Sequence, residues 1–145
     1  MFELGTDGPK TILVGVDGSD TSLRAAAYAA GMARRQGSEL VALFVHTVGG
    51  MASMRAESIT AVRQINVEAV AELRAAIKAQ ADHLGFRGTV VEREGNPALE
   101  IVRLAEELRV DAVVVGASTH AGHRLVGSLA VHLVKQAQWP VTVVP

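Results

Sequence analysis

Apolar residues along this chain follow two patterns: short continuous runs, and longer stretches in which they recur every three or four positions. Five runs are rich in Val, Leu and Ile and have the length of a buried β-strand, at 10–16, 40–45, 89–94, 112–115 and 139–144. The stretches between them predict four amphipathic helices. The sequence therefore predicts strands alternating with helices, in the order βαβαβαβαβ.

Residues that favour helix ends stand at the borders of these segments. Ser19 or Asp20 can cap the first helix, because their short polar side chains accept hydrogen bonds from free backbone N–H groups. Gly37 and Gly85 are expected to end the first and second helices. Pro97 suits the first position of the third helix, where its missing N–H costs nothing.

Each predicted helix carries an apolar stripe that we expect to face a sheet. In the first two helices the stripes are Leu23, Ala26, Ala27, Ala30, Ala33 and Ile59, Val62, Val70, Leu73, Ile77, Ala81, Leu84. In the last two helices they are Ala98, Ile101, Val102, Ala105, Leu108 and Leu129, Leu133, Val134.

Alternation of this kind predicts parallel strands joined by right-handed crossovers, with helices on both faces of the sheet. We therefore expect one doubly wound α/β domain over residues 1–145, with residues 1–9 as a loose N-terminus. Ligands of such folds bind outside the carboxyl ends of the strands, where the strand order reverses. If the first and fourth strands are neighbours there, segments 17–19 and 116–128 face one crevice.

Composition narrows the partners and the location. Fourteen Lys and Arg against fifteen Asp and Glu give a net charge of −1, so we expect no nucleic acid and no anionic membrane as a partner. With no cysteine, disulfides and thiolate metal sites are excluded. The N-terminus has no basic region followed by an apolar core, and no run is long enough to span a bilayer. These features predict a cytoplasmic protein.

The segment 113–128 is the first candidate for chemistry. It runs from a β-branched strand through a loop that begins at Gly116 and ends at Gly127 and Ser128, where a helix pattern starts. Glycines permit close backbone approach and a helix N-terminus attracts anions, so the arrangement suits a phosphate. Alternatively, the loop is an ordinary turn with Ser128 as its helix cap.

Other polar residues also allow two interpretations. Asp17 can accept hydrogen bonds from a ligand, or it can order the turn that follows the first strand. Arg124 can bind a phosphate or form a surface salt bridge, and His120 and His123 can bind a metal, contact a phosphate or lie in solvent. We find no general base paired with a nucleophile and no carboxylate cluster in the loop, so we expect neither catalysis nor a metal held by side chains of the protein.

Four segments in order and across the whole length carry a family resemblance. They are ILVGVDGS at 12–19, GNP at 95–97, VVG at 114–116 followed by GS at 127–128, and WPVTVV at 139–144. The chain resembles the universal stress protein family. The resemblance implies a five-stranded sheet in the order 3-2-1-4-5 and a homodimer formed through the last strand, Val141–Val144. Many members of that family bind ATP.

The resemblance also implies a ligand and its site. The ligand would be ATP, AMP or another adenine nucleotide, with or without magnesium. Asp17 and the Val45 backbone would lie at the adenosine end, and the backbone of Leu129 would lie near the ribose and phosphates. The full predicted site consists of Gly15, Val16, Asp17, Gly18, Ser19, Val45, Val115, Gly116, Ser118, Gly122, Arg124, Gly127, Ser128 and Leu129.

The loop departs from the Gly-x2-Gly-x9-Gly-Ser/Thr pattern of ATP-binding members. Thr119 stands at the second glycine position, and the loop between Gly116 and Gly127 is two residues shorter. Two functions are therefore expected as alternatives. The first is a stress-response regulatory homodimer that binds an adenine nucleotide between strands one and four. The second is a protein-interaction module that does not bind ATP because its phosphate loop is short.

Overall fold

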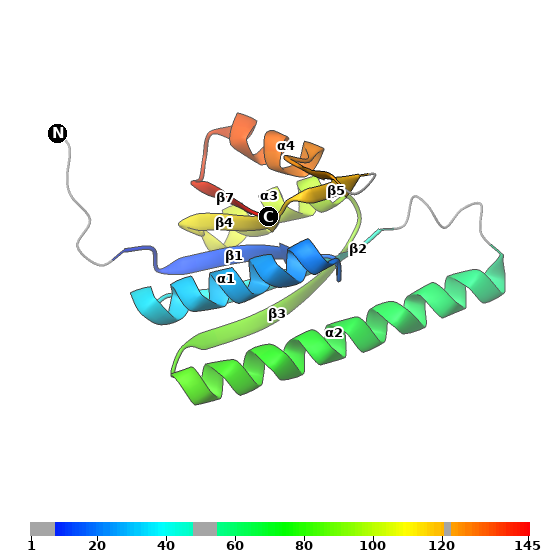
Figure 1. Cartoon of the computed structure of the whole chain (residues 1–145), viewed down its shortest axis with the longest axis horizontal. Coiled ribbons are helices and arrows are strands. Elements are labelled where there is room, and N and C mark those ends of the chain that lie inside the picture. The colour runs from blue at the N-terminus through cyan, green and yellow to red at the C-terminus, as the bar shows by residue number, and fades with distance from the viewer. Residues whose placement is uncertain (1–7, 48–54, 121–122) are drawn as a thin grey trace.

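The structure is a computed structural model, and it describes residues 8–47, 55–120 and 123–145. Its main sheet has five parallel strands in the order β3-β2-β1-β4-β7 (Figure 1). These strands are β1 (Thr11–Val16), β2 (Glu39–His46), β3 (Arg87–Glu94), β4 (Ala112–Gly116) and β7 (Val141–Val144). The helices are α1 (Asp20–Gln36), α2 (Ala56–Leu84), α3 (Pro97–Leu108) and α4 (Ser128–Gln136). The predicted fold class and the 3-2-1-4-5 strand order are confirmed.

Helices cover both faces of the sheet because side chains of its central strands alternate between two cores. Ile12 and Val14 of β1 join the core that contains α1 and α2. Leu13, between them, joins the core that contains α3 and α4. All three side chains are fully buried. Because β1 and β4 pair in parallel, their carboxyl ends lie side by side at the same end of the sheet.

The predicted apolar stripe of α1 was partly wrong. Leu23 is 47% exposed and Ala27 is also exposed, whereas Ala25 and Ala29 are fully buried. Because alanines surround this helix on several sides, their spacing does not fix which side faces the sheet. The large apolar residues predicted at the ends of other stripes, Leu84, Leu108 and Val134, are likewise exposed.

Helix α2 is longer than the strand it covers. Its 29 residues span about 43 Å at the usual helical rise, whereas the eight residues of β3 span about 26 Å. The N-terminal part of the helix consequently extends beyond the sheet (Figure 1). The predicted stripe is buried only from Val70 onward, and Ile59 and Val62 remain partly exposed.

A small second sheet was not predicted. The loop after β4 contains an antiparallel pair, β5 (Ser118–His120) and β6 (His123–Leu125). Among the described residues, no helix is both long and apolar enough to cross a membrane.

Candidate functional site

A cavity of about 600 Å³ lies at the carboxyl ends of β1 and β4. This volume falls in the range of small-molecule sites. Its lining includes eleven of the predicted site residues: Gly15, Val16, Asp17, Ser19, Val45, Val115, Gly116, Ser118, Gly127, Ser128 and Leu129. The structure therefore brings segments from β1, β2, β4 and α4 together around one space.

The remaining three predicted residues do not appear in this lining. Gly18 has a φ of +87° and open space where a Cβ would lie, so its positive φ, rather than close packing, favours glycine in the turn after β1. Gly122 lies outside the described residues. The backbone of Arg124 belongs to β6, but its side chain is outside what the structure describes.

Ten further lining residues were not predicted from the sequence. They are Thr21, Ser22, Leu43, Asn96, Pro97, Ala98, Ile101, Ala117, Ala130 and His132. For two of them, the sequence contains a pattern that could have placed them at the site. Asn96 follows β3 at the same edge of the sheet as the predicted site, and His132 stands one helical turn after Ser128, so the two share a helix face.

Asp17 orders the turn that leads from β1 into α1. Its Oδ1 accepts a hydrogen bond of 2.8 Å from the Ser19 N–H, and its own N–H donates to the Ser22 hydroxyl at 3.2 Å. Burial alone would raise the pKa of Asp17, but hydrogen bonds from Ser19, Ser22 and its own backbone lower it below its usual value. The side chain is therefore an ionised acceptor at neutral pH, and the exposed residue lies at the cavity wall.

The N-terminus of α1 is capped and tightly packed. The Ser19 hydroxyl accepts from the Ser22 N–H at 3.3 Å, and the Ser22 hydroxyl donates to the Ser19 carbonyl at 2.9 Å. Gly116 packs against this turn: a Cβ on it would lie 2.5 Å from the carbonyl carbon of Thr21. Packing between β4 and α1 thus requires glycine at this position.

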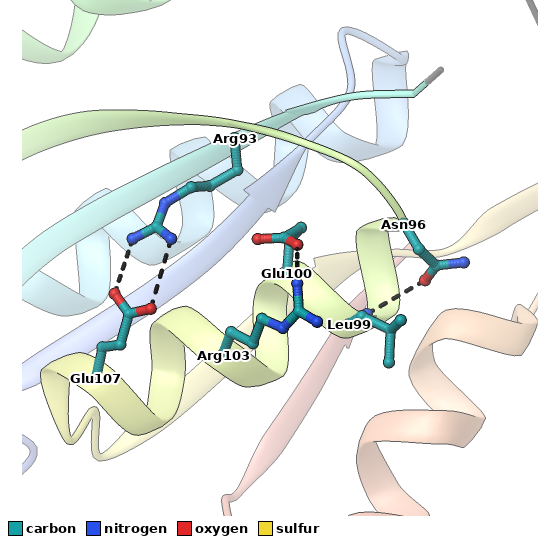
Figure 2. A network of polar contacts seen from close by, with 6 residues as sticks. All are labelled: Arg93, Asn96, Leu99, Glu100, Arg103 and Glu107. Atoms are coloured by element: carbon teal, nitrogen blue, oxygen red, sulfur yellow. Dashed lines mark hydrogen bonds and ion pairs between the residues drawn. The ribbon is translucent and has the colours of Figure 1, made fainter. Parts of the chain in front are cut away.

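The N-terminus of α3 is likewise satisfied by its own chain. The Asn96 side chain accepts from the Leu99 N–H at 3.2 Å, as Figure 2 shows. The buried carboxylate of Glu100 in the first turn pairs with Arg103 at 2.7 Å. This capped turn forms part of the cavity wall.

An ion pair also joins α3 to β3, the edge strand of the sheet. The guanidinium of Arg93 on β3 faces the carboxylate of Glu107 on α3, with the shorter contact at 2.8 Å (Figure 2). Glu107 lies in the last turn of α3, at the opposite end of the helix from the cavity, and both side chains are partly exposed, so this pair contributes little to stability.

The N-terminus of α4 differs from the capped N-termini of α1 and α3. Its N-cap is Gly127, which has no side chain to accept a hydrogen bond, and its first turn contains no acidic residue. Ser128 is the first helical residue and not the cap, which corrects that interpretation of the sequence. Ser128, Leu129 and Ala130 all line the cavity, so the positive end of this helix faces open space.

The strands β5 and β6 lie between β4 and α4 and pair with each other. Ser118 pairs with Leu125, Thr119 with Arg124 and His120 with His123. At the base of this β5–β6 hairpin, a Cβ on Gly127 would overlap the Ser118 hydroxyl. Within the predicted glycine loop, residues 118–120 and 123–125 are therefore paired with each other, and Gly127 is closely packed.

The described part of the cavity wall contains little positive charge. Among its described lining residues, Asp17 is the one carboxylate, His132 is the one imidazole, and neither Lys nor Arg occurs. No group of three or more His, Asp or Glu side chains placed to hold a metal ion was found among the described residues. Hydrogen-bonding groups and the α4 N-terminus thus dominate the polar part of this wall.

Comparison with known proteins agrees with this architecture. The model of the universal stress protein family matches residues 8–145. The chain belongs to this family. Universal stress protein MJ0531 of Methanocaldococcus jannaschii is 34% identical over 138 residues, which cover 93% of this chain and 81% of that protein.

Two solved structures of family members contain nucleotides. A universal stress protein in complex with cAMP is 25% identical, with a TM-score of 0.68, over 94% of this chain and 97% of that one. The universal stress protein from Archaeoglobus fulgidus in complex with dAMP is 24% identical, with a TM-score of 0.61, over 94% of this chain and 98% of that one.

Proposed function

We propose that this universal stress protein binds an adenine nucleotide in the cavity between β1 and β4 and acts as a regulatory protein, not as an enzyme. The observation that carries the proposal is the difference between two parts of one cavity wall. Asp17 supplies an ionised acceptor, and the first turn of α4 presents N–H groups that no N-cap side chain accepts. A nucleotide has the complementary groups, because its base and ribose carry hydrogen-bond donors and its phosphate is an anion.

The nucleotide complexes of two family members support the choice of ligand class. One contains cAMP and the other contains dAMP, so adenine is common to both. In our proposal, Asp17 binds the adenosine part, and the Ser128 hydroxyl and Leu129 N–H bind the phosphate side.

We also propose that two copies associate through β7. This strand is at one edge of the main sheet, and each of its four residues is only partly buried. Its outer edge therefore offers backbone groups that a second copy can pair with. Nucleotide binding would then regulate the stability or shape of the homodimer.

The second candidate function is protein interaction without ATP. It is favoured by Ile65 and Val67 on the projecting part of α2, which are 63% and 59% exposed. Apolar side chains on a helix that extends from the core are available to a partner. In this case the short loop would reflect the loss of nucleotide binding.

The test is calorimetric titration of nucleotide-free protein with AMP. We expect Asp17→Ala to lower the affinity by about tenfold to a hundredfold, because hydrogen bonds to a charged group are lost. Asp17→Asn is the matched control for folding, since its amide oxygen still accepts from the Ser19 N–H; we expect a native unfolding transition and reduced affinity. Unchanged affinity in both variants would exclude Asp17 from the site. A wild-type protein that binds no adenine nucleotide would favour the interaction module.

A further inference from the structure

We infer that the cavity selects adenine nucleotides with a single phosphate group over nucleoside triphosphates. This inference rests on the proposed function and concerns the same site. It follows from the charge of the cavity wall, from two glycines whose neighbouring space is filled, and from the pairing of the loop.

The charge of the wall disfavours a polyphosphate. Each additional phosphate brings further negative charge that must be compensated when water is displaced. The described lining contains no Lys or Arg, and Asp17 adds a negative charge of its own. Among nucleotides, a monophosphate brings the least negative charge to this wall.

The two glycines at the ends of the loop are explained by packing within the protein. The missing side chain of Gly116 makes room for the Thr21 backbone, and that of Gly127 makes room for Ser118. Neither position has empty space at the missing Cβ in which a phosphate chain could lie. The glycines at these two positions are therefore required by packing within the protein, whether or not a phosphate is bound.

The loop also uses its own backbone groups. In an antiparallel pair, opposed residues alternately exchange N–H to C=O hydrogen bonds. The pairing of 118–120 with 123–125 therefore commits part of the loop backbone to the hairpin. Fewer N–H groups remain for a second and third phosphate.

What remains for the ligand is the first turn of α4. Ser128, Leu129 and Ala130 line the cavity, and Gly127, as the N-cap, has no side chain that could accept their N–H groups. One helix N-terminus presents a compact set of N–H groups that suits one phosphate. The site thus has a place for a single phosphate next to a place for adenosine.

The first experiment titrates nucleotide-free wild-type protein with adenosine, AMP and ATP, each with and without magnesium. We expect AMP to bind at least about tenfold more tightly than adenosine, because its phosphate adds charge-assisted hydrogen bonds. ATP should bind no more tightly than AMP. ATP that binds tenfold more tightly than AMP, or adenosine that binds as tightly as AMP, would overturn the selection while leaving adenine binding intact. Failure of all three ligands to bind would instead refute the proposed function.

A pair of variants tests the part played by the hairpin. Thr119→Gly weakens β5, since glycine disfavours strands, whereas Thr119→Val keeps a β-branched residue in the same place. We expect Thr119→Gly to raise the ratio of ATP affinity to AMP affinity severalfold and Thr119→Val to leave that ratio unchanged. The same ratio in both variants and the wild type would show that the hairpin does not limit the ligand.

Discussion

Helices α1 and α4 both begin at the cavity, but their first turns are completed in different ways. In α1, the Ser19 side chain caps the helix, and the buried residues Thr21 and Ser22 are part of the cavity wall. In α4, Gly127 provides no side-chain cap, and Ser128 is exposed. Similar small polar residues thus serve the fold in one helix and remain available to a ligand in the other. Proximity to a cavity alone does not distinguish the two roles; the hydrogen-bond partners do.

The largest expected effect comes from disrupting the contact between Gly116 of β4 and the first turn of α1. Gly116→Ala should lower the free energy of unfolding by about 3 kcal/mol, because its Cβ would force the backbone at Thr21 to move. Urea denaturation measures this loss. Gly18→Ala is the control, since there the space is open and the strain of a positive φ alone costs about 1 kcal/mol. Equal losses in the two variants would contradict the close packing at Gly116.

A smaller effect separates the two helix starts directly. Ser19→Ala should cost about 1 kcal/mol of stability, because the Ser22 N–H loses its side-chain acceptor. Ser128→Ala should change the free energy of unfolding by less than about 0.5 kcal/mol, as is usual for exposed positions. Thermal unfolding of both variants tests the comparison. A comparable loss for Ser128→Ala would mean that this hydroxyl stabilises α4 itself.

The smallest effect is the response of the α1 turn to acid. The pKa of Asp17 is lowered in the folded protein, so its contribution to stability is complete above about pH 3.8 and is lost as the pH falls through the lower, folded value. Because the residue is exposed, we expect less than about 1 kcal/mol. Urea denaturation between pH 5 and 3 should show this loss in the wild type and a weaker pH dependence in Asp17→Asn. An identical dependence in both proteins would assign the acid response to other groups.

Sequence patterns identified the main sheet because its strands are continuous apolar runs buried on both faces. The caps at Ser19 and Gly37 were also predictable, since local chemistry determines them. The rotation of α1 about its axis was not, because Ala25 and Ala27 have the same side chain and only the neighbouring sheet distinguishes them. The partial exposure of Ile59 and Val62 depends on the length of β3, which lies elsewhere in the sequence.

The candidate site was predictable where residues directly follow strands, as Asp17 and Gly116 do. The hairpin was missed because the β5 and β6 segments lack an alternating apolar pattern, and because Thr119 and Arg124 pair only once the chain turns between them. His132 was not predicted as a site residue, although its spacing from Ser128 places both on one helix face. Its presence in the cavity depends on how α4 packs against the sheet.

The projection of α2 beyond the sheet divides the stability of this helix into two regimes. From Val70 onward, the helix shares the core with α1 and β3, so its amides should open only with the cooperative unfolding of the domain. Before Val70, it relies on local terms such as the hydrogen bond between Gln64 and Glu68, which contribute only a few tenths of a kcal/mol. The projecting turns are therefore subject to a local helix–coil equilibrium, and one continuous helix joins a slowly exchanging segment to a rapidly exchanging one.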